Sequence, residues 1–545
     1  MSLSFISFIL FTALVGFICY WKTRNDKMET ADDFFLGGRS LTGWVIAGSL
    51  MLTNLSTEHL IGLNGDAFNH TISIMAWETT AALAMVLAAL FFLPKYLYMG
   101  LTTIPEYLER RFDRATRTIA TCLFLFSYVI AILPVVLLFG ATGIESIFDM
   151  SSTYGLTQGQ SYLILVWGIG TLGSLYAIFG GLKAVAISDT INGIGFLIAG
   201  LLIPYLALNM IGDGDMWAGL SEVYVQENEK FDVTGDEPGS FLPFGVLFTG
   251  MIVNQIFFWC TNQSVIQRAL GTKNLAEGQK GILIAALFKL VGPLIIVLPG
   301  VIAFHLFKAE LGPENSLMAY PMLVKLVLPP VLIGFFAAVM VGAVLSTFNS
   351  VLNSSATLFS EGIYASLINK KATGRQLVFF GRACSVVLAL LAMIVAPMIN
   401  SEGSLFNYLQ KINATFFGPM LAVILLGLFT NNVTAKAAKI GIVVGPIIFA
   451  LIVFVFQDPL QAFLKSTFDL QDDIHFLHFL GLVFVITILV MLSVSRLNKS
   501  THQPMVAATT TSTTPVVDVT PWKHAKPLGA FICFVTILSF VLLAQ

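Results

Sequence analysis

The sequence predicts an all-α protein that crosses a membrane many times. Hydrophobic residues make up 56% of the 545 residues, charged residues only 11%, and the mean hydropathy is +0.84. A soluble protein carries about 25% charged residues. The chain also divides into apolar segments close to the roughly 20 residues that a transmembrane helix needs. These observations together predict a polytopic membrane protein. The net charge of −2 indicates no nucleic-acid partner.

Fourteen segments are apolar and long enough to be transmembrane helices. In chain order they are 4–21, 44–66, 72–94, 118–148, 161–180, 184–211, 244–269, 281–307, 331–361, 377–400, 404–430, 437–456, 476–495 and 527–545. The segment 94–117 is predicted to be an interfacial helix, because one side is apolar and the other basic. The longest outer loop, 212–243, is either a lid or a solvated connector. The Thr-rich stretch 501–518 is predicted to be a flexible linker.

Lys and Arg residues predict the orientation of the chain. If the N-terminus is outside, the cytoplasmic loops contain 21 of the 29 Lys and Arg residues. The opposite loops contain only Lys230, Lys308, Lys325 and Lys465. Since positive charges gather on the cytoplasmic side, we expect both termini outside and a location in the plasma (inner) membrane. The five cysteines lie in or beside apolar runs without paired spacing and are predicted to be packing residues.

A run of polar residues interrupts the second predicted span. Thr53, Asn54, Ser56, Thr57, Glu58 and His59 lie between apolar residues, and Glu78 lies in the next span. Such groups are costly at hydrocarbon depth unless they face protein or a water-filled cavity. Broken helix backbone is tolerated only where it lines such a cavity. The stretch 44–82 therefore predicts a helix that breaks near Asn54 and contributes to a substrate and ion site at the bilayer midplane.

Several later spans also contain ionisable, amide and hydroxyl groups. The most prominent are Asp189, Gln255, Lys289, Ser346, Thr347, Gln410 and Lys411. A single Ser or Thr in a membrane helix usually bonds to its own backbone or holds two helices together. Arg268, Arg382 and Lys411 lie near span ends, where snorkelling or a structural role is expected. Glu78 and Lys289 lie deeper in apolar sequence, so we expect them to pair with each other or with a polar substrate.

These residue types suit two kinds of ligand. Carboxylate, ammonium, amide and imidazole groups can bind sugar hydroxyls. Aromatic residues such as Trp77, Phe258, Trp259 and Phe406 can pack on the apolar face of a sugar ring. Carbonyl oxygens of a broken helix, with hydroxyls from Ser346 and Thr347, would suit a sodium ion.

Three other classes of membrane protein are alternatives. A sodium or solute channel would use the same polar midplane without a substrate-coupled gate. A polytopic membrane enzyme would carry carboxylates clustered at a membrane face beside a metal or phosphate site, whereas Glu78 and Lys289 lie inside spans. A transporter-like sensor would need a signalling domain, and the loops are short. The sequence therefore predicts a transporter and not an enzyme, with no ATP-driving domain on this chain.

Long segments of the chain resemble the sodium:solute symporters, and among them the sodium/glucose (galactose) cotransporters. The resemblance covers nearly the whole chain. It rests on DDFFLGGRS (32–40), SLMLTNLSTEHLIGL (49–63), TTIPEYLERRF (102–112), YAIFGGLKAVAISD (176–189), FFWCTNQSVIQRAL (257–270), AEGQKG (276–281), FKLVGPLIIVLPG (288–300) and LSTFNSVLNSSATLFSEGIY (345–364).

The resemblance implies a leucine-transporter-like fold with two inverted five-helix repeats. The first repeat would occupy 44–211 and the second 244–430, with the outer loop 212–243 between them. One extra span with its cytoplasmic loop would precede the repeats in 1–43. Three more would follow in 431–545, with a cytoplasmic linker at 496–526.

The resemblance also implies roles for individual residues. The sugar site would contain His59, Glu78, Gln255, Lys289 and Gln410, with the aromatic residues Phe258 and Trp259 at its inner boundary. The outer gate would contain Leu63, Trp77 and Phe406. Sodium, the coupling ion, would bind the carbonyls of Leu52, Leu55 and Ala343 and the hydroxyls of Ser346 and Thr347. Asp189 would lie on the sodium path.

The chain departs from the galactose carrier of this family at three of these positions and at Ala81. His59 replaces a Gln, as in the animal glucose carriers, and Gln255 replaces an Asn. Ala81 replaces a sugar-contacting Ser, and Phe258 replaces the usual inner-gate Tyr. The predicted function is sodium-coupled import of a hexose such as glucose or galactose by alternating access. An inositol or a sugar acid is an alternative substrate.

Overall fold

The computed structural model describes residues 3–25, 30–235, 240–399, 404–498 and 517–543. In this part of the chain the protein is helical and contains no strand. The α-helices of the first half are α1 (Leu3–Thr23), α2 (Ala31–Phe35), α3 (Gly43–Asn54), α4 (Asn64–Asn69), α5 (Ala76–Leu87), α6 (Leu93–Tyr98), α7 (Ile104–Arg111), α8 (Arg114–Ser127), α9 (Leu133–Phe148), α10 (Met150–Tyr154), α11 (Gln158–Ile211), α12 (Met216–Gln226), α13 (Gly250–Cys260) and α14 (Gln263–Leu270).

The second half continues the helical bundle. Its α-helices are α15 (Leu275–Ile296), α16 (Leu298–Phe307), α17 (Ala319–Val327), α18 (Pro330–Phe359), α19 (Gly374–Val395), α20 (Leu405–Phe429), α21 (Ala435–Ala450), α22 (Gln457–Phe468), α23 (Phe476–Leu497) and α24 (Ala525–Leu543). Short 3₁₀-helices are η1 (Gly37–Arg39), η3 (Ile72–Met75), η6 (Asn228–Phe231), η7 (Phe244–Phe248), η8 (Pro313–Met318) and η10 (Ala396–Met398). The π-helical turns are η2 (Glu58–Leu63), η4 (Ala88–Phe92), η5 (Tyr128–Ile132), η9 (Ser360–Ile368) and η11 (Leu451–Val455).

Twelve of the described helical segments are long and apolar enough to cross a membrane, and each overlaps a predicted span. The other two predicted spans, 44–66 and 244–269, are interrupted helices. The first breaks at Leu55 and Ser56, between α3 and η2, and the second at Thr261 and Asn262, between α13 and α14. The break near Asn54 was predicted, whereas the second break was not.

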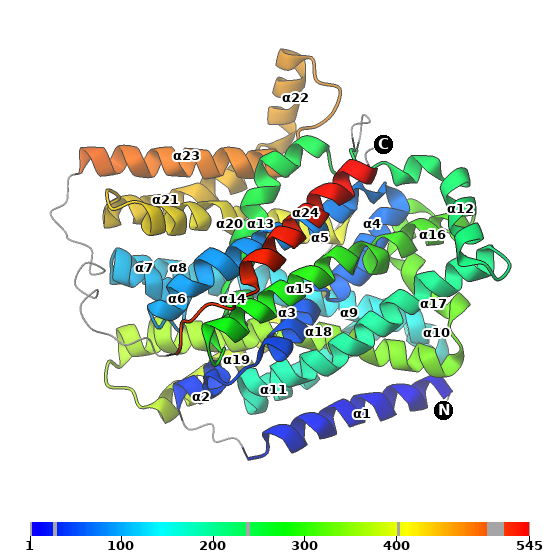
Figure 1. Ribbon diagram of the computed structural model, residues 1–545, viewed down its shortest axis with the longest axis horizontal. Coiled ribbons are helices and arrows are strands. Elements are labelled where there is room, and N and C mark those ends of the chain that lie inside the picture. The colour runs from blue at the N-terminus through cyan, green and yellow to red at the C-terminus, as the bar shows by residue number, and fades with distance from the viewer. Residues whose placement is uncertain (1–2, 26–29, 236–239, 400–403, 499–516, 544–545) are drawn as a thin grey trace.

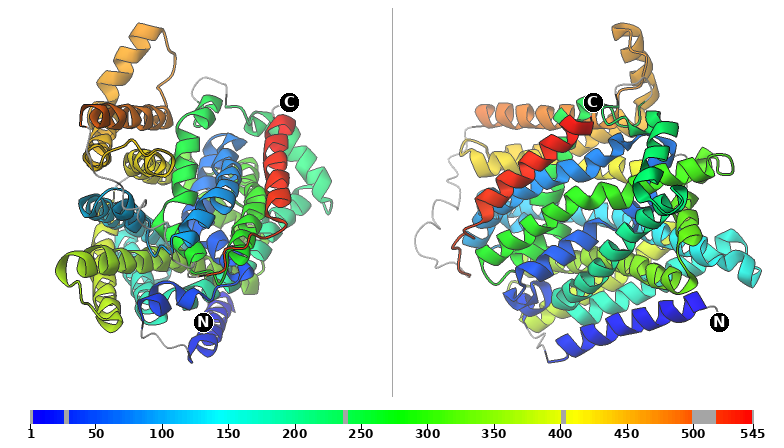
Figure 2. Two further views of the ribbon diagram at one scale, coloured as in Figure 1. Left: turned by 60° about the vertical axis from the view of Figure 1, so that its left-hand side comes forward. Right: turned by 45° about the vertical axis from the view of Figure 1, so that its right-hand side comes forward.

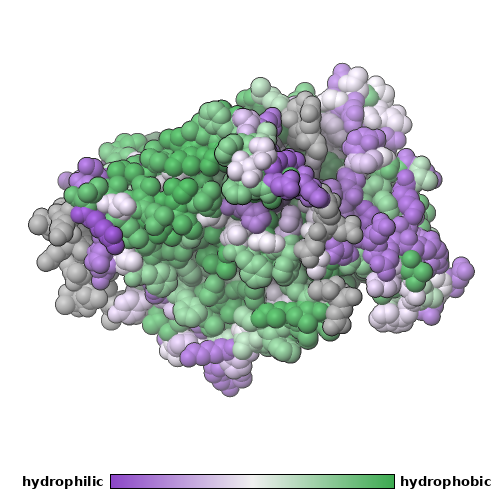
Figure 3. All heavy atoms as spheres, turned by 90° about the horizontal axis from the view of Figure 1, so that it is seen from above, coloured by the Kyte–Doolittle hydropathy of each residue, from purple (hydrophilic) through white to green (hydrophobic). Residues whose placement is uncertain are grey.

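The long helices run side by side along the longest axis of the molecule (Figure 1). Both chain ends lie toward the same end of the bundle as α4 and α12, and α2, α6 and α7 lie at the opposite end. We call these the outer and inner ends, after the orientation predicted from the positive charges. Hydrophobic residues cover the middle of the face in Figure 3, and hydrophilic residues gather mainly toward its two ends. This distribution fits a bundle that crosses a membrane.

The centre of the bundle is formed by helices that are distant in sequence. The broken-helix segment α3 packs against α11, α15 and α18, and α5 packs against α13 and α15. Two predicted spans are joined end to end as α11, which turns at Gly181 with φ of 59°. A Cβ at Gly181 would lie 3.0 Å from the Phe34 carbonyl oxygen, so both the backbone and the space favour glycine there.

Two connections differ from simple loops. The outer loop 212–243 contains α12 and η6, and the connection before α23 contains α22, which stands clear of the bundle (Figure 2). Neither helix was predicted from the sequence. Most of the predicted linker 501–518 lies outside the described residues.

Candidate functional site

The break in the second predicted span borders a small cavity of about 50 Å³ at the centre of the bundle. Eight helical elements line it (α3, η2, α5, η5, α13, α14, α18 and α20), and many of the predicted site residues meet there. The lining residues are Thr53, Asn54, Glu58, His59, Trp77, Ala81, Ile132, Asn254, Gln255, Phe258, Trp259, Ser264, Val265, Thr347, Val351, Leu409, Gln410 and Asn413. Ligand pockets for small molecules typically have volumes of about 300 Å³ or more. The central cavity is therefore in a closed arrangement.

Glu78 and Lys289 form a buried ion pair beside this cavity. The Lys289 Nζ lies 2.5 Å from the Glu78 Oε2, and the two side chains are only 2% and 1% exposed. Lys289 also donates a hydrogen bond to the Asn54 side chain. The pair is not part of the cavity wall, but it contacts the wall: the His59 Nε2 lies 3.7 Å from the Glu78 Oε1. Burial of a lysine is tolerated here because the carboxylate and amide oxygens satisfy the ammonium.

An aromatic cluster closes the cavity on its outer side. The ring of Phe406 from α20 lies 5.6 Å from the ring of Trp77 and 5.3 Å from that of His59, both edge to face. Phe406 is 1% exposed and Leu63 is fully buried. Leu63 follows Gly62, at which a Cβ would lie only 3.1 Å from the Phe406 Cβ. Of the residues predicted as an outer gate, Trp77 and Phe406 therefore pack against each other, and Leu63 is buried on the π-helical turn η2 that follows the break.

Gln255 lines the central cavity, and its side-chain NH2 group is bonded to the neighbouring helix. Its Nε2 donates to the Trp77 carbonyl oxygen at 2.8 Å and to the Thr80 hydroxyl at 3.3 Å. These bonds tie α13 to α5. Gln410 also lines the cavity, and its side chain makes no hydrogen bond to the described residues. Trp259 lies with its ring 5.4 Å from the Lys289 ammonium, and Phe258 packs edge to face on Trp259.

The residues predicted to hold sodium lie where α18 crosses the end of α3. Thr347 donates its hydroxyl to the Thr53 carbonyl at 2.8 Å, and the Ser346 hydroxyl lies 3.2 Å from that of Thr53. Thr53 lies between Leu52 and Leu55 in the last turn of α3, immediately before the break. Ala343 precedes Ser346 by one turn of α18 and is fully buried. Neutral hydroxyl and carbonyl oxygens of this kind suit a sodium ion at a broken helix.

Asp189 is fixed in a separate buried cluster toward the inner end. Its carboxylate lies 3.4 Å from the Arg268 guanidinium and accepts a hydrogen bond from the Ser49 hydroxyl at 2.6 Å. Arg268 is fully buried and also donates to Ser49 and Ser350. Since Ser350 lies one turn after Ser346 on α18, this cluster borders the candidate sodium residues.

Several lining residues were not assigned a role from the sequence. Asn54 bonds to Lys289, and Glu58 accepts a hydrogen bond from Ser56 within the break. Asn254 and Asn413 also line the cavity. The signal for Asn54 and Glu58 was their place in the polar run of a predicted span. For Asn254 and Asn413 the signal was only an amide at hydrocarbon depth.

The outer loop is anchored on the outer half of the broken helix. The Lys230 ammonium donates to the carbonyl oxygens of Phe68 at 2.7 Å and His70 at 2.9 Å, at the end of α4. Burial lowers the pKa of Lys230 to about 8, although Glu227 and Glu229 act in the opposite direction. An ammonium at a helix C-terminus is favourable because unpaired carbonyls point toward it. The loop is thus connected to the helix that contains the break.

This all-helical fold, with broken helices around a buried polar site, is that of a secondary transporter and not of an enzyme. The chain belongs to the sodium:solute symporter family, whose model matches residues 34–445. It is therefore a multi-pass membrane protein that couples the movement of a small solute to sodium.

The chain is 41% identical to the uncharacterized symporter YidK of Escherichia coli, over all of this chain and 91% of that protein. It is 33% identical to the sodium/glucose cotransporter of Vibrio parahaemolyticus, over 81% of this chain and 84% of that protein. It is 29% identical to the sodium/myo-inositol cotransporter 2 of Oryctolagus cuniculus, over 96% of this chain and 80% of that protein.

Solved structures show the same fold. The substrate-bound, outward-open structure of a sodium-coupled sialic acid symporter matches with a TM-score of 0.75 and 20% identity, covering 92% of this chain and 99% of that one. Mhp1, a nucleobase-cation-symport-1 family transporter, matches in a closed conformation with a TM-score of 0.54 and 14% identity, covering 86% and 96%. These likenesses support the predicted leucine-transporter-like class.

Proposed function

We propose that this symporter imports a hexose, such as glucose or galactose, together with sodium by alternating access. The main observation that supports this proposal is the central cavity, where imidazole, amide and aromatic side chains meet beside the Glu78–Lys289 ion pair. This combination offers hydrogen-bond donors and acceptors for hydroxyl groups and flat apolar surfaces for a sugar ring. The relative from Vibrio parahaemolyticus, named a sodium/glucose cotransporter, supports the same substrate class.

In this mechanism sodium binds where α18 meets the break after α3 and favours the arrangement with an open outer gate. Sugar then enters, and the Trp77–Phe406 contact closes above it. Coupling requires that sodium bind one arrangement more tightly than the other, because equal affinity would shift no population. We assign His59, Glu78, Lys289 and Gln410 to the sugar. Because Lys289 and Glu78 are paired in the closed arrangement, sugar hydroxyls must enter that hydrogen-bond network or share it.

One sodium ion per sugar is sufficient on energetic grounds. Moving one charge through about 100 mV yields about 2.3 kcal/mol. A roughly tenfold sodium gradient adds about 1.4 kcal/mol. Together these support accumulation of a neutral solute by roughly 500-fold. We further propose that the protein lies in the plasma (inner) membrane with both termini outside.

A second polyol, myo-inositol, is the alternative substrate. It is supported by the relatives named sodium/myo-inositol cotransporter 2, and by Gln255, Ala81 and Phe258, which differ from the galactose carrier. Both solutes would use the same hydrogen-bonding groups.

The test is uptake of radiolabelled glucose, galactose, myo-inositol and a sugar acid by proteoliposomes with an imposed sodium gradient, with potassium and proton gradients as controls. We expect saturable, uphill, sodium-dependent uptake of a hexose, and counterflow that distinguishes a carrier from a channel. Uptake of only the sugar acid, or of none of these solutes, would contradict the proposal.

A further inference from the structure

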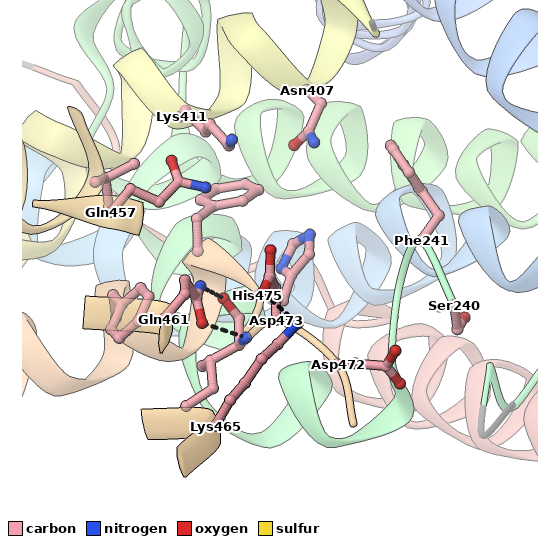
Figure 4. A pocket seen from close by; sticks show the side chains of 14 residues that line it. Ser240, Phe241, Asn407, Lys411, Gln457, Gln461, Lys465, Asp472, Asp473 and His475 are labelled. Carbon is pink, nitrogen blue, oxygen red and sulfur yellow. Dashed lines mark hydrogen bonds and ion pairs between the residues drawn. The ribbon is translucent and has the colours of Figure 1, made fainter. Parts of the chain in front are cut away.

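A second, larger cavity of about 400 Å³ lies at the outer end of the bundle. Its walls come from five segments: Ser240 and Phe241 before α13, the first turns of α20, η11, the connection that contains α22, and the first turn of α23 (Figure 4). We call it the outer cavity. Its volume falls within the range of about 300–1,000 Å³ that small-molecule sites occupy.

The outer cavity adjoins the central one along α20. Asn407 and Lys411 line the outer cavity, whereas Gln410 and Asn413 line the central cavity. Phe406, which packs on Trp77 and His59 above the central cavity, immediately precedes Asn407. With 3.6 residues per turn, Asn407 and Lys411 lie on the face of α20 next to the one that carries Phe406 and Gln410, so a solute in the outer cavity would lie beside the turn of α20 that carries the predicted gate residue.

The far wall of the outer cavity is held in place by its own side chains. Gln461 of α22 donates to the Ile474 carbonyl at 2.7 Å and accepts from the Ile474 amide at 2.8 Å. Lys465 forms an ion pair of 2.8 Å with Asp473. These contacts connect α22 to the segment that leads into α23, and they occupy those three polar side chains (Figure 4).

Other polar side chains of the cavity have no hydrogen-bond or ion-pair partner among the described residues. No hydrogen bond or ion pair with the described residues engages the side chains of Lys411, Asn407 or Gln457, and Figure 4 shows Lys411 and Asn407 extending from α20 toward the cavity. His475 lies across from them. Its Nδ1 accepts from the Leu477 amide at 3.3 Å, and its buried Nε2 has no partner among the described residues.

His475 is a hydrogen-bond donor in this setting. Burial, together with His478 and Lys411 nearby, lowers the pKa of His475 to about 3. The ring is therefore neutral near pH 7. Since Nδ1 accepts a hydrogen bond, the proton lies on Nε2, which finds no acceptor in the part of the chain that the structure describes. A buried donor without a partner is costly and indicates that a ligand or solvent atom completes it.

The chemistry of these groups selects a class of ligand. An ammonium, an imidazole N–H and two carboxamides present mainly donors, which disfavour a metal cation and suit a solute rich in acceptor oxygens. Phe241, Phe476 and Phe479 add apolar surface to the same cavity. Asp472 also lines it, so the cavity is not selectively anion-binding.

We propose that the outer cavity is a second binding site of this symporter, in which a polyhydroxylated solute of the transported class docks on Lys411, Asn407, Gln457 and His475 before the outer gate opens. The proposal rests on the proposed function, because it assumes that the transported solute is a sugar or polyol. Occupancy of the outer cavity would hold the solute next to Phe406 and raise the frequency with which an opened gate captures it.

The test is the number of solute molecules bound per purified transporter, measured by equilibrium dialysis with radiolabelled glucose, galactose and myo-inositol at saturating sodium. Wild-type protein is expected to bind two molecules. Lys411→Met removes the free ammonium and is expected to weaken the outer site about tenfold or more, equivalent to about 1.4 kcal/mol, leaving one molecule at the same concentration. Asn407→Ala is the second variant, and Glu78→Gln is expected to remove the central molecule and leave the outer one.

Uptake and a matched control complete the design. Lys325→Met changes an exposed lysine of α17 outside both cavities and is expected to keep two sites. In Lys411→Met we expect the KM for uptake to rise while kcat stays near the wild-type value. The second site would be overturned if wild type saturates at one bound molecule, or if both Lys411→Met and Asn407→Ala still bind two. Either result would leave the proposed function intact. If none of these solutes binds wild type, the proposed function fails as well.

Discussion

The Glu78–Lys289 ion pair allows a structural role to be separated from a role in transport. Lys289→Met keeps the length of the side chain but leaves the Glu78 carboxylate without its partner in a site that is at most 2% exposed. Breaking a buried pair by removing one member costs about 3–5 kcal/mol, because an uncompensated charge remains. Replacing both members with neutral groups removes that penalty. The double variant Glu78→Gln/Lys289→Met should therefore be more stable than Lys289→Met alone.

The size of this effect can be measured as a shift in Tm. The entropy of unfolding is about 2.1 cal/mol/K per residue, so a destabilisation of 3–5 kcal/mol corresponds to a loss of about 3–4 °C for a chain of this length. Detergent-solubilised protein would be heated and the folded fraction followed by size-exclusion chromatography. We expect the double variant to regain most of this loss, yet to remain inactive in sugar uptake, because both polar groups are assigned to the proposed sugar site.

Lys308→Met is the matched control. Lys308 also lies 2.5 Å from a carboxylate, that of Glu227, but its side chain is 46% exposed. A solvent-exposed pair contributes only about 0–1 kcal/mol, so the Tm should change little. Equal losses in the single and double variants, or uptake by Lys289→Met at the wild-type rate, would refute the reasoning.

Three further predictions follow from other contacts. Ser346→Ala and Thr347→Ala should raise the sodium concentration for half-maximal uptake by about 2–12-fold, whereas Thr347→Ser should not, because a hydroxyl is worth about 0.5–1.5 kcal/mol; unchanged sodium dependence would remove the assignment. Phe406→Ala should increase solute efflux without sodium, because the ring that contacts Trp77 is lost; tight vesicles would contradict the gate. Burial acts to raise the pKa of Asp113, but hydrogen bonds from Lys439 and the first turn of α8 hold it below its usual value. This contribution is present above the unfolded pKa of about 3.9 and is lost as the pH falls through the folded value. Asp113→Asn should thus lower the free energy of unfolding by less than about 1 kcal/mol at pH 7, seen as a slightly lower Tm, and this difference should disappear as the pH falls through the folded pKa.

The polar run in the second span illustrates what could be predicted locally. Residues 53–59 are polar except for Leu55 and have apolar flanks, and the chain does break at Leu55 and Ser56. The polar run was enough to predict the break, because polar side chains at this depth are not compatible with an intact apolar helix. The second break, at Thr261 and Asn262, was missed, because its polar residues adjoin the end of the predicted span and were counted as ordinary span residues.

Contacts between residues that are far apart in the sequence were harder to predict. Asn54 bonds to Lys289, which is 235 positions away, and Arg268 pairs with Asp189 across 79 positions. Sequence analysis supplied the expectation that buried charges need partners, but several partners were chemically equivalent. The helix α22 was also missed, because a short amphipathic segment between two spans has no strong apolar signal.

The sequence by itself determined the membrane class, the spans that form uninterrupted helices, the family and the break near Asn54. Each of these follows from the hydropathy or the residue pattern of a continuous segment. Only the tertiary structure decided that Glu78 and Lys289 are paired outside the cavity wall, that the central cavity is closed to about 50 Å³, and that Lys411 faces a separate outer cavity. Those features depend on how helices from distant parts of the chain pack against one another, and the free energy of that packing is not encoded in any single segment.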